Sequence, residues 1–244
     1  MARRRRRRKW IRSAVVRWSL YLAGGLALVN LMMVLPLRWI PPPVSAVMVW
    51  DRLGTILGGD GEKSRIDYRW TDWEDISPHA ALAVMASEDQ KFPYHRGFDL
   101  EAIADAVEER LDGRRLRGAS TITQQVAKNL YLWQGKSFWR KGLEAWLTVL
   151  IEACWNKRRI LEVYLNIAEF GRHVYGVEAA SRHYFSKPPS ELTLWESSRL
   201  AAVLPNPRRM NPGRPSGYVI SRAVWIQKQV RLMGGMEALK PIGH

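Results

Sequence analysis

The sequence predicts a mainly α-helical domain that follows a single membrane-spanning helix. Three observations support this fold class. Apolar residues recur at helical spacing through most of the chain after Pro78, an uncharged apolar segment lies near the N-terminus, and prolines punctuate the C-terminal part. There is no internal repeat. At 244 residues, length alone is compatible with one large domain or two small ones.

The N-terminal tail, residues 1–18, is strongly basic. Nine of the 38 lysines and arginines lie before residue 19 with no acidic residue among them, and they make up much of the formal net charge of +15. Tails of this kind bind nucleic acid or lie beside membranes. The segment that follows favours the membrane, so we expect no nucleic-acid partner.

Residues 19–40 are the predicted transmembrane anchor. Residues 19–37 carry no charge, and 19 residues are about the length that crosses a ~30 Å hydrocarbon layer as a helix. Asn30 and Pro36 are unfavourable there but tolerable in a spanning helix. The positive-inside rule keeps the basic tail in the cytoplasm and sends the remainder across. A cleaved signal peptide is the alternative, but the apolar stretch exceeds the usual length and no A-x-A-like site follows it.

Residues 41–74 are expected to be a linker or lead-in of ill-defined structure, with a stiff Pro41-Pro42-Pro43 start and a possible extended segment at 66–73. Residues 75–244 are predicted to form the domain. Its clearest helix carries an apolar stripe with i, i+4, i+7, i+8, i+11 spacing: Leu143, Leu147, Leu150, Ile151 and Cys154. Further helical patterns lie at 81–85, 100–107, 160–170, 177–184 and 191–204.

A polar segment at 118–129 is predicted to begin a helix. Ser120 is the expected N-cap, and Thr121, Gln125 and Lys128 then share one helix face, with Gln124 beside them. Free N–H groups at a helix start attract anions, and a lysine two turns along adds a full charge. The segment therefore suggests an anion site, although an ordinary capped helix with a solvated polar face is the alternative from these residues alone.

The acidic pair Glu88-Asp89 precedes this segment. A carboxylate that acts as a general base needs partial desolvation and a nearby partner, and the apolar residues before the pair and Phe92 after it offer such surroundings. Two exposed acids at a helix end are the alternative. His95 has no histidine or cysteine partner at metal-ligand spacing, which favours a role in a loop or cap over a metal site.

Two more clusters follow. Arg140 and Glu144 stand four residues apart and could form a simple surface ion pair, and Glu162 and Asn166 lie one helical turn apart. Each cluster is a weak signal by itself. Their order, spacing and shared polarity make a stronger one.

Together these motifs resemble those of the peptidoglycan glycosyltransferases, the family shared by bifunctional penicillin-binding proteins and monofunctional biosynthetic transglycosylases. The matching patterns are ED-x-x-F-x-x-H-x-G at 88–97, G-x-STITQQ-x-x-KN at 118–129, RK-x-x-E at 140–144, ILE-x-YLN at 160–166 and G-x-E-A-A-x-x-x-YF at 176–185. The resemblance covers roughly residues 75–212. Neither Ser-x-x-Lys nor Lys-Thr-Gly occurs, so the monofunctional type, without transpeptidase chemistry, is expected.

The resemblance implies a lysozyme-like α fold with lipid II and the growing glycan strand as substrates. The 4-hydroxyl of GlcNAc would attack C1 of MurNAc with inversion, and undecaprenyl diphosphate would leave. Glu88 matches the general base and Glu144 the family's second carboxylate. Preorganised cations would stabilise the developing negative charge. The residues expected to bind the diphosphate or the sugars are Lys128, Arg140, Lys136, Ser120, Thr121, Gln124, Gln125, Asn129, Asp89, Phe92 and His95.

The resemblance also bears on cofactors and location. A divalent cation such as magnesium could bridge the diphosphate, but the sequence has no dedicated metal cage and no cofactor is expected to be essential. We expect the bacterial inner membrane, a periplasmic catalytic domain, and contacts with other cell-wall synthesis or division proteins. Trp133, Phe138, Trp139 and Trp146 could dip into the membrane interface; packing in the core is the alternative, about equally favoured for Trp146.

Two other functions compete with this interpretation. A peptidoglycan-cleaving lysozyme or lytic transglycosylase would share a central glutamate, but a hydrolase has no diphosphate to hold. A non-enzymatic membrane scaffold would use the arginine tail on acidic lipids and would be indifferent to the loss of Glu88.

Overall fold

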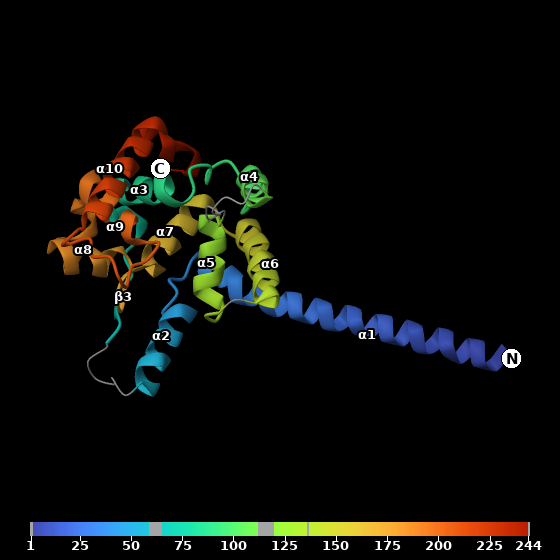
Figure 1. Cartoon of the computed structure of the whole chain (residues 1–244). Coiled ribbons are helices and arrows are strands. Elements are labelled where there is room, and N and C mark those ends of the chain that lie inside the picture. The colour runs from blue at the N-terminus through green and yellow to red at the C-terminus, as the bar shows by residue number, and fades with distance from the viewer. Residues whose placement is uncertain (1, 59–64, 112–119, 136, 244) are drawn as a thin grey trace. The chain divides into compact units, whose positions relative to one another are not determined.

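The computed structural model describes residues 2–58, 65–111, 120–135 and 137–243. These fall into two compact units, Met1–Ile40 and Pro41–His244 (Figure 1). The first unit holds helix α1 (Ala2–Val34) and the short 3-10 helix η1 (Leu35–Arg38). The second holds the remaining elements, including the residues of all the motifs.

Most of the predicted anchor, residues 19–40, lies in α1, and its last residues lie in η1 and just after it. The span Val16–Arg38, 23 residues with a mean hydropathy of 2.0, is the one segment of the described ranges that is long and apolar enough to cross a membrane. The side-chain amide of Asn30 donates to Leu26 O at 2.7 Å, which satisfies a polar group inside the helix itself. Pro36 falls just after α1 ends, where the missing N–H costs little.

The second unit is mainly helical, as predicted. Its α-helices are α2 (Ala46–Leu57), α3 (Pro78–Glu88), α4 (Leu100–Leu111), α5 (Ile122–Tyr131), α6 (Phe138–Cys154), α7 (Lys157–Ile167), α8 (Val177–Phe185), α9 (Leu194–Val203) and α10 (Gly217–Leu232). The unit also contains three 3-10 helices: η2 (Trp73–Asp75), η3 (Pro189–Glu191) and η4 (Gly235–Ile242).

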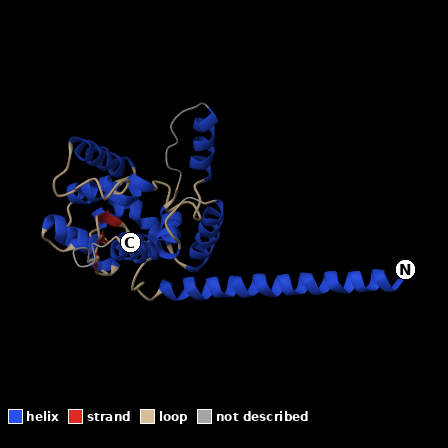
Figure 2. Cartoon of the chain, turned by 60° about the horizontal axis from the view of Figure 1, so that its bottom comes forward, coloured by secondary structure: helices blue, strands red, loops and turns tan. Residues whose placement is uncertain are grey.

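A small sheet completes the unit (Figure 2). Its strands are β1 (Asp67–Tyr68), β2 (Glu169–Gly171) and β3 (Val174–Tyr175), in the order β1-β3-β2. Strand β3 pairs with β1 in parallel and with β2 antiparallel. Gly176 ends β3 at φ +84°, and a Cβ there would lie 2.5 Å from Asn166 O, so the close approach of α7 to this turn requires glycine.

The core forms around α3. Residues 80–86 of this alanine-rich helix are all buried, and the helix packs against α9, α10 and α7. Ser77 accepts from His79 N and Pro78 opens the first turn, both favourable at a helix start. Helix α5 packs between α6 and α7. The ends of α3 and the faces of α5 are therefore held rigidly, which matters because both carry motif residues.

Three sequence-based expectations were wrong. Residues 46–57, expected as ill-defined lead-in, form α2, which packs on α5. The helix predicted at 160–170 ends at Ile167, and Phe170 lies in β2. Helix α10 was not predicted, although it packs on α3 and α9.

Candidate active site

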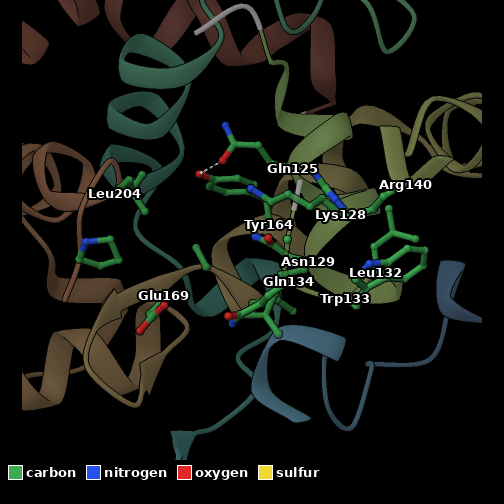
Figure 3. A pocket seen from close by; sticks show the side chains of 15 residues that line it. Gln125, Lys128, Asn129, Leu132, Trp133, Gln134, Arg140, Tyr164, Glu169 and Leu204 are labelled. Carbon is green, nitrogen blue, oxygen red and sulfur yellow. Dashed lines mark hydrogen bonds between the residues drawn. The ribbon is translucent and has the colours of Figure 1, made fainter. Parts of the chain in front are cut away.

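Glu88 is the last residue of α3, and both of its carboxylate oxygens accept hydrogen bonds. Gln125 on α5 donates Nε2–H to Glu88 Oε2 at 2.9 Å, and the neighbouring Ser87 hydroxyl donates to Oε1 at 3.2 Å. The hydroxyl of Tyr164 on α7 in turn donates to Gln125 Oε1 at 3.3 Å (Figure 3). These donors suit an ionised carboxylate, which can only accept. Both carboxylate oxygens of Glu88 are therefore held by donors from other side chains.

Glu88 lines a cleft of about 310 Å³, which we call the acidic cleft. Ser120 is exposed here, as a substrate ligand would be, and Asp99 and Asp105 add negative charge. Lys91 is the cation on its wall. The Glu88 carboxylate thus lies beside a space that a second reactant could enter.

The turn after Glu88 is fixed by Asp89 and His95. His95 Nε2 lies 2.9 and 3.0 Å from the two Asp89 oxygens, while its Nδ1 accepts from Gly97 N at 3.2 Å. Ile122 N donates to Asp89 Oδ2 at 3.0 Å. Asp89 is therefore the anion at the start of α5. The expectation that this helix N-terminus holds a substrate anion is corrected: the protein's own carboxylate occupies it.

The cap of α5 also differs from the prediction. Thr121, not Ser120, is the N-cap: its hydroxyl accepts from Gln124 N, and the Gln124 side chain accepts from Thr121 N in a capping box. The Thr121 hydroxyl also donates to Gly97 O at 2.7 Å. Both side chains are buried. The structure assigns them to the helix cap, in contrast to the predicted contacts with sugar or phosphate oxygens.

Phe92 and Gly97 complete this support. Phe92 is 0% exposed with Lys157 Nζ 4.5 Å from its ring centroid, so the predicted contact of its side chain with a substrate is wrong in this structure. Gly97 has φ +86°, and a Cβ there would lie 2.7 Å from Thr148 Cγ2. The glycine of this motif is needed for backbone conformation and for close packing on α6.

A second cleft, of about 340 Å³, lies on the other side of Gln125 (Figure 3). We call it the basic cleft, because Lys128 and Arg140 are its cations, with Asn129 beside them and Glu169 as the acid on its wall. Burial lowers the pKa of Lys128; Arg140 and Lys141 act in the same direction, and Glu144 and Glu88 oppose it. A desolvated ammonium with cationic neighbours gains from an anionic ligand.

Glu144 holds one cation of this cleft, Arg140. It is 3% exposed and accepts from Arg140 Nη1 at 3.3 Å and from Lys141 Nζ. The Nε of Arg140 is buried and has no hydrogen-bond partner among the described residues. A buried, unpaired guanidinium nitrogen is costly without a ligand or water. Glu144 thus orients Arg140, and Arg140 keeps one donor free.

Magnesium would find few ligands in the basic cleft. Glu144, the nearest buried carboxylate, is committed to two cations, and Glu169 accepts from Arg208 Nε at 2.7 Å. No group of three or more His, Cys, Asp or Glu within the described ranges could hold a metal ion. The donor set of this cleft does not fit a magnesium ion held by the protein.

The ILE-x-YLN motif is mostly structural. Asn166, 0% exposed, accepts from Thr71 N at 2.8 Å and donates to Thr71 O and Glu162 O, both at 2.9 Å. Glu162 accepts from Trp73 N at 3.0 Å. These bonds fasten the segment after β1 to α7. Tyr164 is the residue of this motif that reaches the candidate active site. No role was predicted for it from the sequence, although it belongs to the motif.

The predicted site residues therefore divide into three groups. The clefts bring together Glu88, Gln125, Lys128, Asn129, Arg140 and Ser120. Hydrogen bonds within the protein hold Asp89, His95, Thr121, Gln124 and Glu144, of which Asp89 and Thr121 also line the acidic cleft, and Phe92 is buried. Lys136 lies outside the described residues. The Gln125–Glu88 hydrogen bond links a residue of the basic cleft to a residue of the acidic cleft.

Comparison with known proteins identifies the family. The Transglycosylase family model matches residues 56–231. A biosynthetic peptidoglycan transglycosylase of Xanthomonas campestris pv. campestris (strain B100) is 51% identical over 221 residues, 90% of this chain and 89% of that protein. Proteins with the same description from Shewanella oneidensis and Chromohalobacter salexigens are 49% and 47% identical, over 90% and 96% of this chain and 93% and 98% of their own lengths.

The helical fold, the two clefts and these similarities define the class of protein: this chain belongs to the transglycosylase family. It is a peptidoglycan glycosyltransferase, with one N-terminal apolar helix that fits a membrane anchor.

Proposed function

We propose that the enzyme polymerises lipid II into β-1,4-linked glycan strands, with Glu88 as general base. The observation that carries the proposal is the hydrogen bond from Gln125, which lines the basic cleft, to Glu88, which lines the acidic cleft. An acceptor sugar in the acidic cleft and a lipid diphosphate in the basic cleft would then approach each other at this residue.

The reaction is one displacement. The Glu88 carboxylate takes the proton of the acceptor's 4-hydroxyl, and the oxygen attacks C1 of the donor sugar. The C1–O bond to the diphosphate breaks as the new bond forms, so C1 inverts and undecaprenyl diphosphate leaves. General-base help of this kind contributes roughly 10²–10⁴-fold in rate. Lys128 and Arg140 stabilise the charge that develops on the leaving oxygens.

The hydrogen bonds to Glu88 favour synthesis over cleavage. A lysozyme-like enzyme needs a protonated carboxyl that gives its proton to the glycosidic oxygen. Ser87 and Gln125 both donate toward Glu88, which stabilises a carboxylate rather than a carboxylic acid. The basic cleft, with its desolvated Lys128, gives a diphosphate a place that a hydrolase does not need.

We further propose that α1 anchors the enzyme in the inner membrane with the basic tail in the cytoplasm and the catalytic unit in the periplasm. The charge asymmetry around Val16–Arg38 supports this orientation. Cysteine residues introduced in the tail and in the catalytic unit, labelled with an impermeant maleimide in spheroplasts, test it. We expect labelling in the catalytic unit alone; labelling of the tail alone would reverse the orientation.

Exposed aromatic residues support contact of the catalytic unit with the bilayer. Trp133, Phe138, Trp139 and Trp146 are 41%, 98%, 86% and 43% exposed. Phe138 and Trp139 open α6, Trp146 lies in its middle, and Trp133 precedes it and lines the basic cleft. Amphipathic rings favour the membrane interface, where the lipid part of the substrate resides.

The full-length enzyme in detergent with fluorescently labelled lipid II tests the proposed reaction. We expect glycan polymer from the wild type and almost none from Glu88→Gln, which keeps the side-chain shape but cannot accept the proton. Intact sacculi serve as the second substrate. Solubilised sacculi without polymer from lipid II would assign the cleaving activity instead, and equal polymerisation by Glu88→Gln would remove Glu88 as the base.

A further inference from the structure

Each of the two residues that donate a hydrogen bond to Glu88 also accepts one from another residue of the protein. On one side, Tyr164 OH donates to Gln125 Oε1 and Gln125 Nε2–H donates to Glu88 Oε2. On the other, Arg222 Nη2 donates to the Ser87 hydroxyl oxygen at 3.3 Å, and that hydroxyl donates to Glu88 Oε1. Gln125 and Ser87 donate to the carboxylate directly, and Tyr164 and Arg222 donate to those two side chains. We call these chains the Tyr164 arm and the Arg222 arm.

The Tyr164 arm is built from a buried, neutral hydroxyl. Tyr164 is 1% exposed, and burial, followed by the charges of Glu88 and Asp89, raises its pKa well above 10. The phenol therefore keeps its proton throughout the physiological range and remains a donor. Because it donates to the carbonyl end of the Gln125 amide, it holds the NH₂ end toward Glu88.

The Arg222 arm comes from α10, beyond the last motif that the sequence analysis matched. The Arg222 guanidinium carbon lies 5.5 Å from the centroid of the Trp225 ring, and its Nε is buried with no hydrogen-bond partner among the described residues. Leaving such a donor unpaired costs free energy. The guanidinium still points into the α3–α10 contact, where it meets Ser87.

We propose that Tyr164 and Arg222 are positioning residues that hold the Glu88 carboxylate in one orientation and favour its ionised form. The inference rests on the proposed role of Glu88 as general base. Neither residue needs to touch substrate: each acts through an intermediate side chain, Gln125 or Ser87. Fixing a catalytic group from two sides reduces the reorganisation that the reaction would otherwise require.

The other charged groups near Glu88 belong to neither arm. Lys91, Asp99 and Asp105 line the acidic cleft with it, and Lys128 on α5 and Asp89 in the following turn face the same region. The ionisable groups of the neighbouring elements α9 and η4 are bonded elsewhere: Glu196 to Lys187, Arg199 to Pro212 O and Glu237 to Lys240. A change in pH dependence on substitution of either arm would therefore report on that arm.

The first experiment compares Arg222→Met with Arg199→Met in the full-length enzyme. Arg199 is a matched control, since it also stacks on an aromatic ring, that of Phe185, but donates to a backbone carbonyl. For Arg222→Met we expect kcat to fall roughly tenfold, or about 1.4 kcal/mol, with KM unchanged. The acidic limb of the pH–rate profile should move up by about one unit, because the charged base has lost a stabilising donor. Arg199→Met should leave the limb in place.

The same comparison applies to Tyr164→Phe and Tyr175→Phe. Both hydroxyls are buried, and that of Tyr175 donates to Asp51 Oδ2 at 3.1 Å, outside either arm. Both variants should lose similar stability in thermal unfolding. Tyr164→Phe alone should lower kcat and move the acidic limb upward. A limb that stays in place for Tyr164→Phe and Arg222→Met while Glu88→Gln is inactive would overturn the inference and leave the proposed function intact.

Ser87→Ala keeps the test decisive if Arg222→Met folds poorly. It removes the link and leaves the arginine in place, so it should reproduce the shifted limb. The double variant Ser87→Ala/Arg222→Met should shift the limb no further, because both substitutions break one chain. Additive shifts would show that Arg222 acts on Glu88 by another route, and Arg222→Lys should restore part of the lost kcat if a cationic donor to Ser87 is what matters.

Discussion

The two halves of helix α5 carry polar residues of one motif and use them differently. In the first turn, Thr121 and Gln124 cap the helix, and Asp89 fills its N-terminus. In the later turns, Gln125 and Lys128 face the clefts. The first half holds the helix in place and the second presents groups to ligands. A polar residue of a motif is thus a candidate for binding a ligand only when some of its hydrogen-bond donors or acceptors are not already bonded within the protein.

The largest effect is expected when a cation of the basic cleft is removed. Lys128→Met should lower polymerisation of labelled lipid II by roughly 10²–10³-fold, the loss typical of one preorganised group that stabilises transition-state charge. Lys141→Met is the matched control, because Lys141 also bonds Glu144 but does not line the basic cleft. Equal losses in the two variants would mean that charge near Glu144, not the position of Lys128, matters.

Two asparagines, one in the interior and one in the basic cleft, should respond differently to substitution by alanine. Asn166→Ala should destabilise the enzyme by about 3 kcal/mol, since it leaves the buried Thr71 backbone groups unpaired. Asn129→Ala, in the basic cleft, should change stability by less than about 0.5 kcal/mol. Denaturant unfolding monitored by tryptophan fluorescence measures both. A larger loss for Asn129→Ala would contradict the division.

The exposed aromatic residues give a smaller effect. Trp133→Ser with Trp139→Ser should weaken the binding of residues 41–244 to liposomes roughly tenfold, because apolar surface that entered the interface is lost. Tyr218→Ser on α10, 57% exposed, is the control and should bind as the wild type does. Unchanged co-sedimentation of the double tryptophan variant would count against membrane contact at this surface.

The smallest effect concerns pH. Burial lowers the pKa of Lys128 below its ordinary 10.5, so its positive charge is present at low pH and is lost at a lower pH than that of a free lysine. Arginine stays charged. Lys128→Arg should therefore extend the alkaline limb of the pH–rate profile to higher pH, whereas Lys141→Arg should not. If the alkaline limb stays in place in Lys128→Arg, that limb reports the titration of a group other than Lys128.

The helical class, the apolar N-terminal span and most helices of the catalytic unit were predicted from the sequence, because helical spacing repeats over many consecutive residues. Strands of two or three residues, such as β2 and β3, have no such pattern and were missed, whereas β1 lies within the extended segment expected at 66–73. Helix α2 was missed because it follows three prolines and exposes much of its apolar surface, including Trp50 and Leu57. The apolar stripe of α6 is likewise wider than its buried face, since Leu143 is 42% exposed.

The candidate site was predicted in its members but not in their roles. Sequence spacing placed Gln125 and Lys128 on one helix face, and both line the basic cleft. Spacing could not show that Asp89 would reach across to Ile122 N, because that bond joins residues 33 apart in the chain. Arg222 carried no local signal, since it reaches Ser87 only through the packing of α10 on α3.

Glu88 and Asp89 provide the most direct test, because they are adjacent carboxylates on opposite sides of the division. The measurement is polymerisation of labelled lipid II per folded molecule, with the melting temperature of each variant. We predict that Glu88→Gln melts as the wild type and forms almost no polymer, whereas Asp89→Asn melts at a lower temperature and keeps turnover within about tenfold. Full activity of Glu88→Gln, or an inactive Asp89→Asn with an unchanged melting temperature, would contradict the account.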